Sequence, residues 1–133
     1  MEEIKRYQIR GLPNPVVRVR FGERLVDYWA PLSDTEHLLI AHDGQNIFDR
    51  KTATKFSTWK LAEKAIAVAD NLGKAPPAII AIFNGKTKSD PHGRARDLCP
   101  EDPFHEGIKS AAPAKFELSA LRGNSYLNQI FTE

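Results

Sequence analysis

Two short polar segments, each following an apolar run, carry the residues of this sequence that could do chemistry. The first is HDGQN at 42–46, after the run HLLIA at 37–41, and the second begins with NG at 84–85, after AIIAIF at 78–83. Continuous apolar runs are typical of strands covered on both faces in a parallel sheet. Functional groups gather at the carboxyl ends of such strands. The two loops therefore supply the candidate residues His42, Asp43, Gly44, Gln45, Asn84 and Gly85.

Adjacent His42 and Asp43 have the residue types of a catalytic or metal-binding pair. Neighbouring side chains at a strand end point in different directions, so we interpret them as hydrogen-bonded residues that hold the loop. A calcium loop would need the D-x-[DN]-x-[DN]-G order with a distal glutamate, and zinc would need a spacing such as H-E-x-x-H. Neither pattern occurs, so we expect no metal site and no cofactor.

A serine nucleophile in a G-x-S-x-G turn is absent from the sequence. Gly123-Asn124-Ser125 comes nearest, but Leu127 stands where the second glycine should be, and no apolar strand precedes it. We therefore assign no catalytic residue to this chain.

Composition and charge narrow the classes of protein. The 133 residues are 41% apolar and 27% charged, with a net charge of +2, which predicts one globular domain rather than a disordered chain. The basic residues are scattered, which argues against nucleic acid as a partner. The single cysteine, the absence of a signal-peptide pattern and the lack of any run of about 20 apolar residues favour a cytoplasmic protein without a membrane partner.

The elements that position the two loops follow from hydrophobic periodicity. Residues 16–21 and 24–32 predict an antiparallel hairpin that turns at Gly22-Glu23. Apolar residues from Trp59 to Leu72 predict a helix with a core-facing stripe, capped by Ser57 or Thr58 and ended by Gly73. The helix lies between the two apolar runs, so the sequence predicts a βαβ unit with parallel strands and an α/β fold.

The remainder of the sequence is less informative. After Gly85 it is rich in proline and glycine, which predicts a long loop over residues 86–122 whose role the pattern does not define. Residues 125–131 have the apolar spacing of one more helix.

Residues 42–49 (HDGQNIFD) resemble the strand-end signature H-D-G-Q-N-L-F-D of the esterase family that includes the enterochelin esterases, with Ile47 in place of leucine. Three further features fall in the family's order. These are TWKL at 58–61, the apolar strand ending in NG, and RARDLCP at 94–100, which is similar to R-x-x-E-Y-x-P but has Asp97 and Leu98 at the Glu and Tyr positions. GNSYL at 123–127 is similar to the family's G-x-x-Y-L. The resemblance covers about residues 24–133.

This resemblance implies that residues 1–133 are the N-terminal part of a single α/β-hydrolase domain, ending before the nucleophile elbow. The family's reaction implies a serine-dependent hydrolase of carboxylic esters, with a small-molecule ester as the partner. Two backbone N–H groups of such an enzyme stabilise the charge that develops on the substrate's carbonyl oxygen, and one of them comes from the loop after the third strand. The resemblance places that donor at Gln45, with Gly44 beside it.

Two other functions remain open on the sequence alone. The missing triad is also expected of a truncated or degenerate relative that acts as a binding or assembly module. Its uncovered sheet edge would favour self-association. A nucleotide-binding βαβ module is the third alternative, although neither G-x-G-x-x-G nor a P-loop is present.

Overall fold

The structure, a computed structural model, describes residues 1–98. The chain divides into two compact units, Met1–Phe83 and Asn84–Glu133. The first unit contains the sheet and the loop that follows HLLIA, and the described part of the second contains one short helix.

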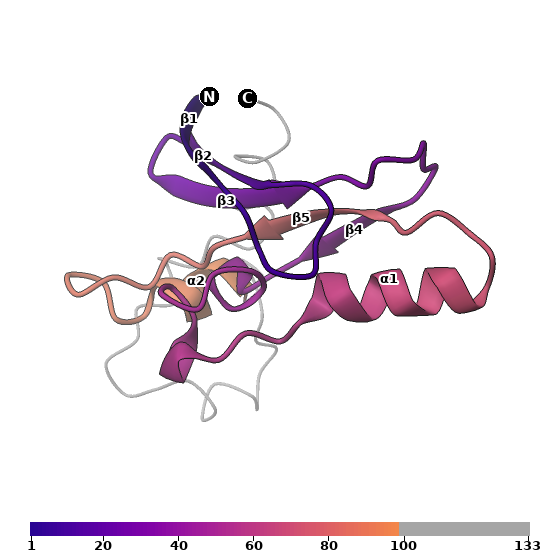
Figure 1. The fold of residues 1–133 in the computed structure, drawn as a ribbon. Coiled ribbons are helices and arrows are strands. Elements are labelled where there is room, and N and C mark those ends of the chain that lie inside the picture. The colour runs from indigo at the N-terminus through magenta and orange to yellow at the C-terminus, as the bar shows by residue number, and fades with distance from the viewer. Residues whose placement is uncertain (99–133) are drawn as a thin grey trace, which may run out of the picture. The chain divides into compact units, whose positions relative to one another are not determined.

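The first unit is built on a five-stranded mixed sheet with the order β1-β2-β3-β5-β4 (Figure 1). The pairs β1–β2, β2–β3 and β3–β5 are antiparallel, whereas β5 and β4 are parallel. The architecture is therefore mixed α/β. The strands are β1 (Glu2–Tyr7), β2 (Val16–Phe21), β3 (Arg24–Trp29), β4 (Leu38–Ala41) and β5 (Ala78–Ile82).

The predicted hairpin is confirmed as β2 and β3. Phe21 pairs with Arg24 across a two-residue turn, and Gly22 at the first turn position has a φ of 55°. This is a backbone conformation that glycine adopts without the Cβ penalty of other residues.

Strand β1 was not predicted, because its sequence EEIKRY has no apolar alternation and nearly all of it is exposed. It forms by pairing with β2, with Lys5 opposite Arg18 and Tyr7 opposite Val16. Residues opposite each other in a ladder share a face of the sheet. Strand β1 therefore adds Lys5 and Tyr7 to the face on which Arg18 lies.

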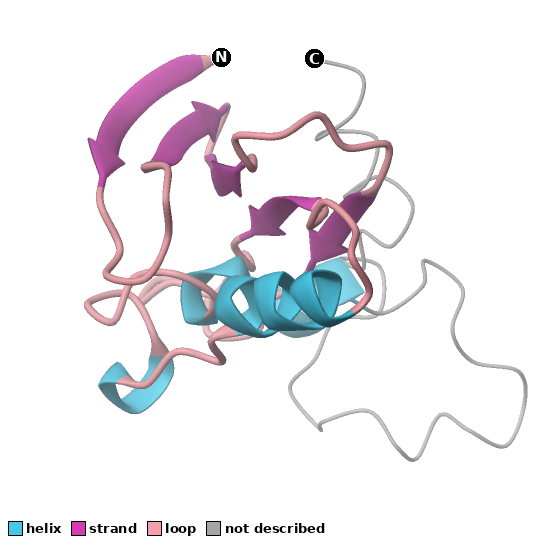
Figure 2. Cartoon of the chain, turned by 45° about the vertical axis from the view of Figure 1, so that its right-hand side comes forward, coloured by secondary structure: helices cyan, strands magenta, loops and turns pink. Residues whose placement is uncertain are grey.

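The predicted βαβ unit is confirmed in its order and its parallel pairing. Helix α1 (Leu61–Asn71) connects β4 to β5 and packs against one face of the sheet (Figure 2). Gly73, at a φ of 62°, ends the helix as predicted, because Lys74 N donates to Ala69 O and Gly73 N to Asp70 O. These two bonds form a Schellman motif.

The start of α1 differs from the prediction. Ser57 and Thr58 do not cap it. The residue before the first turn is Lys60, in the left-handed conformation and without a side-chain capping bond. The apolar stripe is also shorter than predicted, since Trp59 and Leu72 are 52% and 64% exposed.

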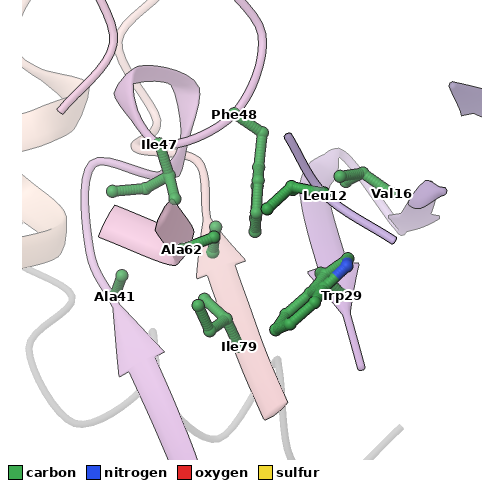
Figure 3. Packing of buried hydrophobic residues seen from close by; sticks show 9 residues of the cluster. Leu12, Val16, Trp29, Ala41, Ile47, Phe48, Ala62 and Ile79 are labelled. Carbon is green, nitrogen blue, oxygen red and sulfur yellow. The ribbon is translucent and has the colours of Figure 1, made fainter. Parts of the chain in front are cut away.

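The core lies between α1, the sheet and the loop after β4. Trp29 of β3 and Ile79 of β5 face Ala62 of α1, and Ile47 and Phe48 of the loop point into the same cluster (Figure 3). The HDGQNIFD segment is therefore anchored by its own apolar residues.

Strand β4 is less covered than predicted. Leu39 packs against the core, but Leu38 and Ile40, on the opposite face, are 55% and 42% exposed. The prediction that both faces are covered is wrong for β4, which lies at the edge of the described sheet. Whether an apolar strand such as β4 is buried depends on the elements that pack against it. The hydrophobicity of its own sequence does not specify these elements.

The second unit contains α2 (Gly93–Leu98) in the region predicted as loop. The predicted helix at 125–131 lies outside the described residues. Within residues 1–98, no helix is long and apolar enough to cross a membrane.

Candidate functional site

The loop after β4 begins with a sharp change of backbone direction. Asp43 has φ 54° and ψ 41°, the left-handed conformation, and Gly44–Asn46 then form one turn of 3₁₀ helix. Aspartate is among the few residues other than glycine that tolerate this conformation. His42 is exposed, whereas Asp43 and Gly44 are buried and Gln45 is partly buried.

Gly44 is required by packing rather than by the turn. A Cβ on this residue would lie 2.5 Å from the carbonyl oxygen of Ala81 and 2.6 Å from the backbone nitrogen of Ile82. These separations are far below van der Waals contact, so only glycine lets the loop lie against the backbone of β5. The left-handed residue of the turn is Asp43 and not Gly44.

The orientation of the Gln45 N–H follows from the bonds of the 3₁₀ turn. Asn46 N donates to Asp43 O at 2.9 Å, and Ile47 N donates to Gly44 O at 3.1 Å. The peptide between Gly44 and Gln45 is trans, and a trans peptide points its C=O and N–H in opposite directions. The Gln45 N–H is therefore held pointing away from Ile47, toward the start of the turn.

Asn46 connects the turn to the start of α1. Its Oδ1 accepts a hydrogen bond from Thr54 N at 2.8 Å, and its carbonyl oxygen accepts one from Trp59 N at 2.8 Å. The side chain is buried. Asn46 therefore holds the segment before α1 to the turn through one side-chain bond and one backbone bond.

Asp49, the last residue of the motif, lies among charged groups from the sheet. Its Oδ2 is 3.1 Å from Lys5 Nζ and 3.5 Å from Arg18 Nη2, and its Oδ1 accepts from Lys51 N at 2.9 Å. Burial of the carboxyl acts to raise its pKa. The bonds from Lys51 and Lys5, together with the charge of Arg18, outweigh burial and lower the pKa of Asp49 below its ordinary value.

The same network continues across the sheet to Asp27. Arg18 Nε and Nη2 donate to the two oxygens of Asp27 at 2.7 and 2.8 Å, and the Tyr7 hydroxyl donates to Asp27 Oδ2 at 2.7 Å. Asp27 is fully buried. Burial and the adjacent Asp27 carboxylate raise the pKa of Tyr7, which keeps its hydroxyl protonated as a donor.

Sequence reasoning missed this network because its members lie far apart in the chain. One signal was available in the sequence, because Asp27 alternates with Leu25 and Trp29 and therefore falls on the same face of the strand as these two apolar residues.

The loop after β5 belongs to the second unit, and two hydrogen bonds within that unit fix its backbone. Asn84 Oδ1 accepts from Lys86 N at 3.1 Å, and Gly85 N donates to Asp97 Oδ2 at 2.6 Å. Asp97 is 3% exposed, and its carboxylate has a structural role. It fixes the backbone of Gly85 from α2.

The structure thus brings His42, Asp43, Gly44 and Gln45 together in one turn. Strands β4 and β5 are parallel, with Ala41 opposite Ala81, whereas Asn84 and Gly85 belong to the second unit. No described group of three or more His, Cys, Asp or Glu residues within 1–98 could hold a metal ion.

No family model, curated protein or solved structure matches this chain. The resemblance described above therefore depends on the residues of the sequence, and the fold is established at the level of a mixed α/β sheet.

Proposed function

We propose that this chain supplies the oxyanion-hole loop of a serine-dependent hydrolase of carboxylic esters. The Gln45 N–H would be one of the two donors to the developing oxyanion. In this proposal the serine, the histidine and the acid of the triad follow residue 133. The observation that carries the proposal is the fixed Gly44–Gln45 peptide in the loop between β4 and α1.

Several features of the loop support this role. It follows the third strand when the strands are counted from β2, and it precedes the first helix, which is where such hydrolases place one oxyanion donor. Bonds within the turn fix the peptide, and Ile47 and Phe48 anchor it in the core. A donor held in place before the reaction stabilises developing charge without reorganising during it.

In the reaction, the hydroxyl of the serine would attack the ester carbonyl while histidine takes its proton. The carbonyl oxygen becomes an oxyanion, which the Gln45 N–H and the N–H after the serine would stabilise. Collapse of the tetrahedral intermediate expels the alcohol and leaves an acyl-enzyme, which water then hydrolyses.

The test begins with the reading frame downstream of the Glu133 codon. We expect an apolar strand followed by G-x-S-x-G and a later histidine. The longer protein should hydrolyse p-nitrophenyl butyrate, and changing the elbow serine to alanine should abolish this activity. A longer chain without the elbow, or one whose activity survives that change, would overturn the proposal.

The Gln45 donor is tested with a matched pair of variants in the longer protein. Gln45→Pro deletes the N–H, whereas Gln45→Ala keeps it and removes only the side chain. We expect kcat to fall about 100–1,000-fold for Gln45→Pro, the usual loss for one oxyanion-hole donor, and to stay near wild type for Gln45→Ala. Unfolding curves would show that both variants are folded. Equal activities of the two would exclude Gln45 as a donor.

A second candidate function, self-association through β4, is favoured by its exposed apolar residues. Leu38 and Ile40 lie on an edge strand of the described sheet, and exposed apolar edges favour pairing between chains.

Sedimentation of the 133-residue chain tests this function. Ile40→Lys should convert dimers or larger species to monomers, because an inserted charge opposes edge pairing. Val68→Lys, at a position 58% exposed on α1, is the control and should leave association unchanged. A monomeric wild type at high concentration would remove this candidate.

A further inference from the structure

Asp49 attaches the loop after β4 to strands β1 and β2, at the opposite edge of the sheet. Its carboxylate contacts Lys5 of β1 and Arg18 of β2, 44 and 31 positions away along the chain (49 minus 5 and 49 minus 18). Strand β4 is separated from β2 by β5 and β3 in the sheet. The loop therefore reaches back over the sheet to make these contacts.

The two cations that contact Asp49, Arg18 and Lys5, make further contacts of their own. Arg18 is 6% exposed and is fixed by its two-bond contact with Asp27. The guanidinium also lies 4.8 Å from the centre of the Phe83 ring. Lys5 Nζ lies 4.6 Å from the centre of the Tyr7 ring. Arg18 is therefore preorganised to bind Asp49, which limits the entropy lost when this contact forms.

Asp49 is connected to the peptide that follows Gln45. The Thr52 hydroxyl lies 2.9 Å from Gln45 O and 3.0 Å from Asp49 O, and its single proton is shared between these two carbonyl oxygens. Thr52 N and Ala53 N also donate to Asp49 O, at 3.1 and 3.0 Å. A shift of Asp49 would therefore displace the turn that orients Gln45.

We propose that Asp49 is a positioning residue for the 3₁₀ turn that presents the Gln45 N–H, and that Lys5 and Arg18 make strands β1 and β2 part of this site. The assignment of a role to Gln45 depends on the proposed function. The attachment of the turn through Asp49 does not, and it is measured separately.

Amide hydrogen exchange in the 133-residue protein tests the attachment. The probes are the N–H groups of Asn46 and Ile47, which are bonded within the turn, with Val19 and Val26 of the hairpin as references. Asp49→Asn removes the charge at nearly constant size. We expect exchange of the two turn amides to accelerate about tenfold or more, the effect of losing a hydrogen bond to a charged group, while the hairpin amides keep their rates.

Three more variants define the cause. Asp49→Glu keeps the charge and should restore most of the protection. Lys5→Gln should loosen the turn less than Asp49→Asn, because Arg18 remains. Glu3→Gln is the matched control on the same strand, since it breaks only the exposed Glu3–Arg6 ion pair, and it should leave the turn unchanged.

Two results would overturn the proposal. Equal acceleration of turn and hairpin amides in Asp49→Asn would mean that Asp49 only contributes to global stability. Unchanged exchange in both Asp49→Asn and Lys5→Gln would mean that the turn is held without it. These experiments measure amide exchange and not enzyme activity. Their outcomes therefore test the role of Asp49 whether or not the esterase proposal holds.

Discussion

Asp43 and Gly44 have different roles at the start of the loop after β4. Asp43 takes the left-handed conformation that turns the chain, and Gly44 provides the space for the loop to lie against β5. An aspartate costs less in this conformation than most residues with a Cβ. The D-G pair thus allows both the turn and the close approach within two positions.

Asp49 is expected to make the stability of the protein depend on pH in the acid range. Its pKa in the folded protein is lowered from the ordinary 3.8. A carboxyl with a lowered folded pKa contributes stability above its unfolded pKa, and this contribution is lost as the pH falls through the folded value. The contribution is therefore full at neutral pH and is lost progressively as the pH falls below about 3.8.

Urea unfolding of wild type and Asp49→Asn at pH 7 and at pH 3 measures this effect. At pH 7 the wild type should be more stable by about 1.5–3 kcal/mol, the range for hydrogen bonds to charged groups. At pH 3 the difference should shrink. A difference that is constant or larger at pH 3 would contradict the lowered pKa.

Helix α1 begins under local backbone strain. Lys60, the residue before its first turn, has a φ of 52°, and Lys55 and Phe56 upstream are also left-handed. Such residues cost about 1–2 kcal/mol each relative to ordinary conformations. The burial of Ala62 and Ala69 against the sheet holds the helix in place despite this start.

Substitution of lysine by glycine at the start of α1 and inside α1 should have opposite effects on the free energy of unfolding. Lys60→Gly relieves the left-handed strain and places an accepted N-cap residue, so we expect a gain of about 0.5–1 kcal/mol. Lys64→Gly, inside the exposed face of the helix, should lose about 1 kcal/mol. Thermal unfolding of both variants measures the difference. Destabilisation by Lys60→Gly would show that the lysine side chain makes a contribution larger than the strain.

A hydrophobic cluster centred on Trp29 stabilises the first unit. This residue is 1% exposed, and its Nε1 has no hydrogen-bond partner within the described residues. Its contribution to stability is therefore mainly apolar contact, with Ile79 beside it in the ladder and Ala62 above. The charged network from Lys5 to Asp49 lies on the same sheet face and is covered by the loop rather than by α1.

The two tryptophans provide a matched test of this core. Trp29→Ala should lower the free energy of unfolding by about 3–5 kcal/mol, the usual cost of removing a large buried aromatic residue. Trp59→Ala removes a side chain that is 52% exposed and should cost much less. Fluorescence-monitored urea unfolding reports on the remaining tryptophan in each variant. Similar losses in both would place Trp59 in the core as well.

The sequence by itself determined the elements whose hydrophobic pattern is strong. These are the β2–β3 hairpin, the parallel β4–β5 pair joined by α1, the end of that helix at Gly73, and the position of the HDGQN turn at a strand end. Each depends on local periodicity or on a backbone conformation that one residue type favours, and both are encoded within a few positions.

Only the tertiary structure decided the remaining features. Strand β1 forms because β2 offers it an unpaired edge, and its own charged sequence predicts no strand. The start of α1 at Leu61 results from a loop that is fixed by Asn46, and the exposure of Leu38 and Ile40 depends on what lies against β4. The ion network joins residues from β1, β2, β3 and the loop after β4. Contacts between residues so distant in the chain are set by strand order and register, which no local pattern contains.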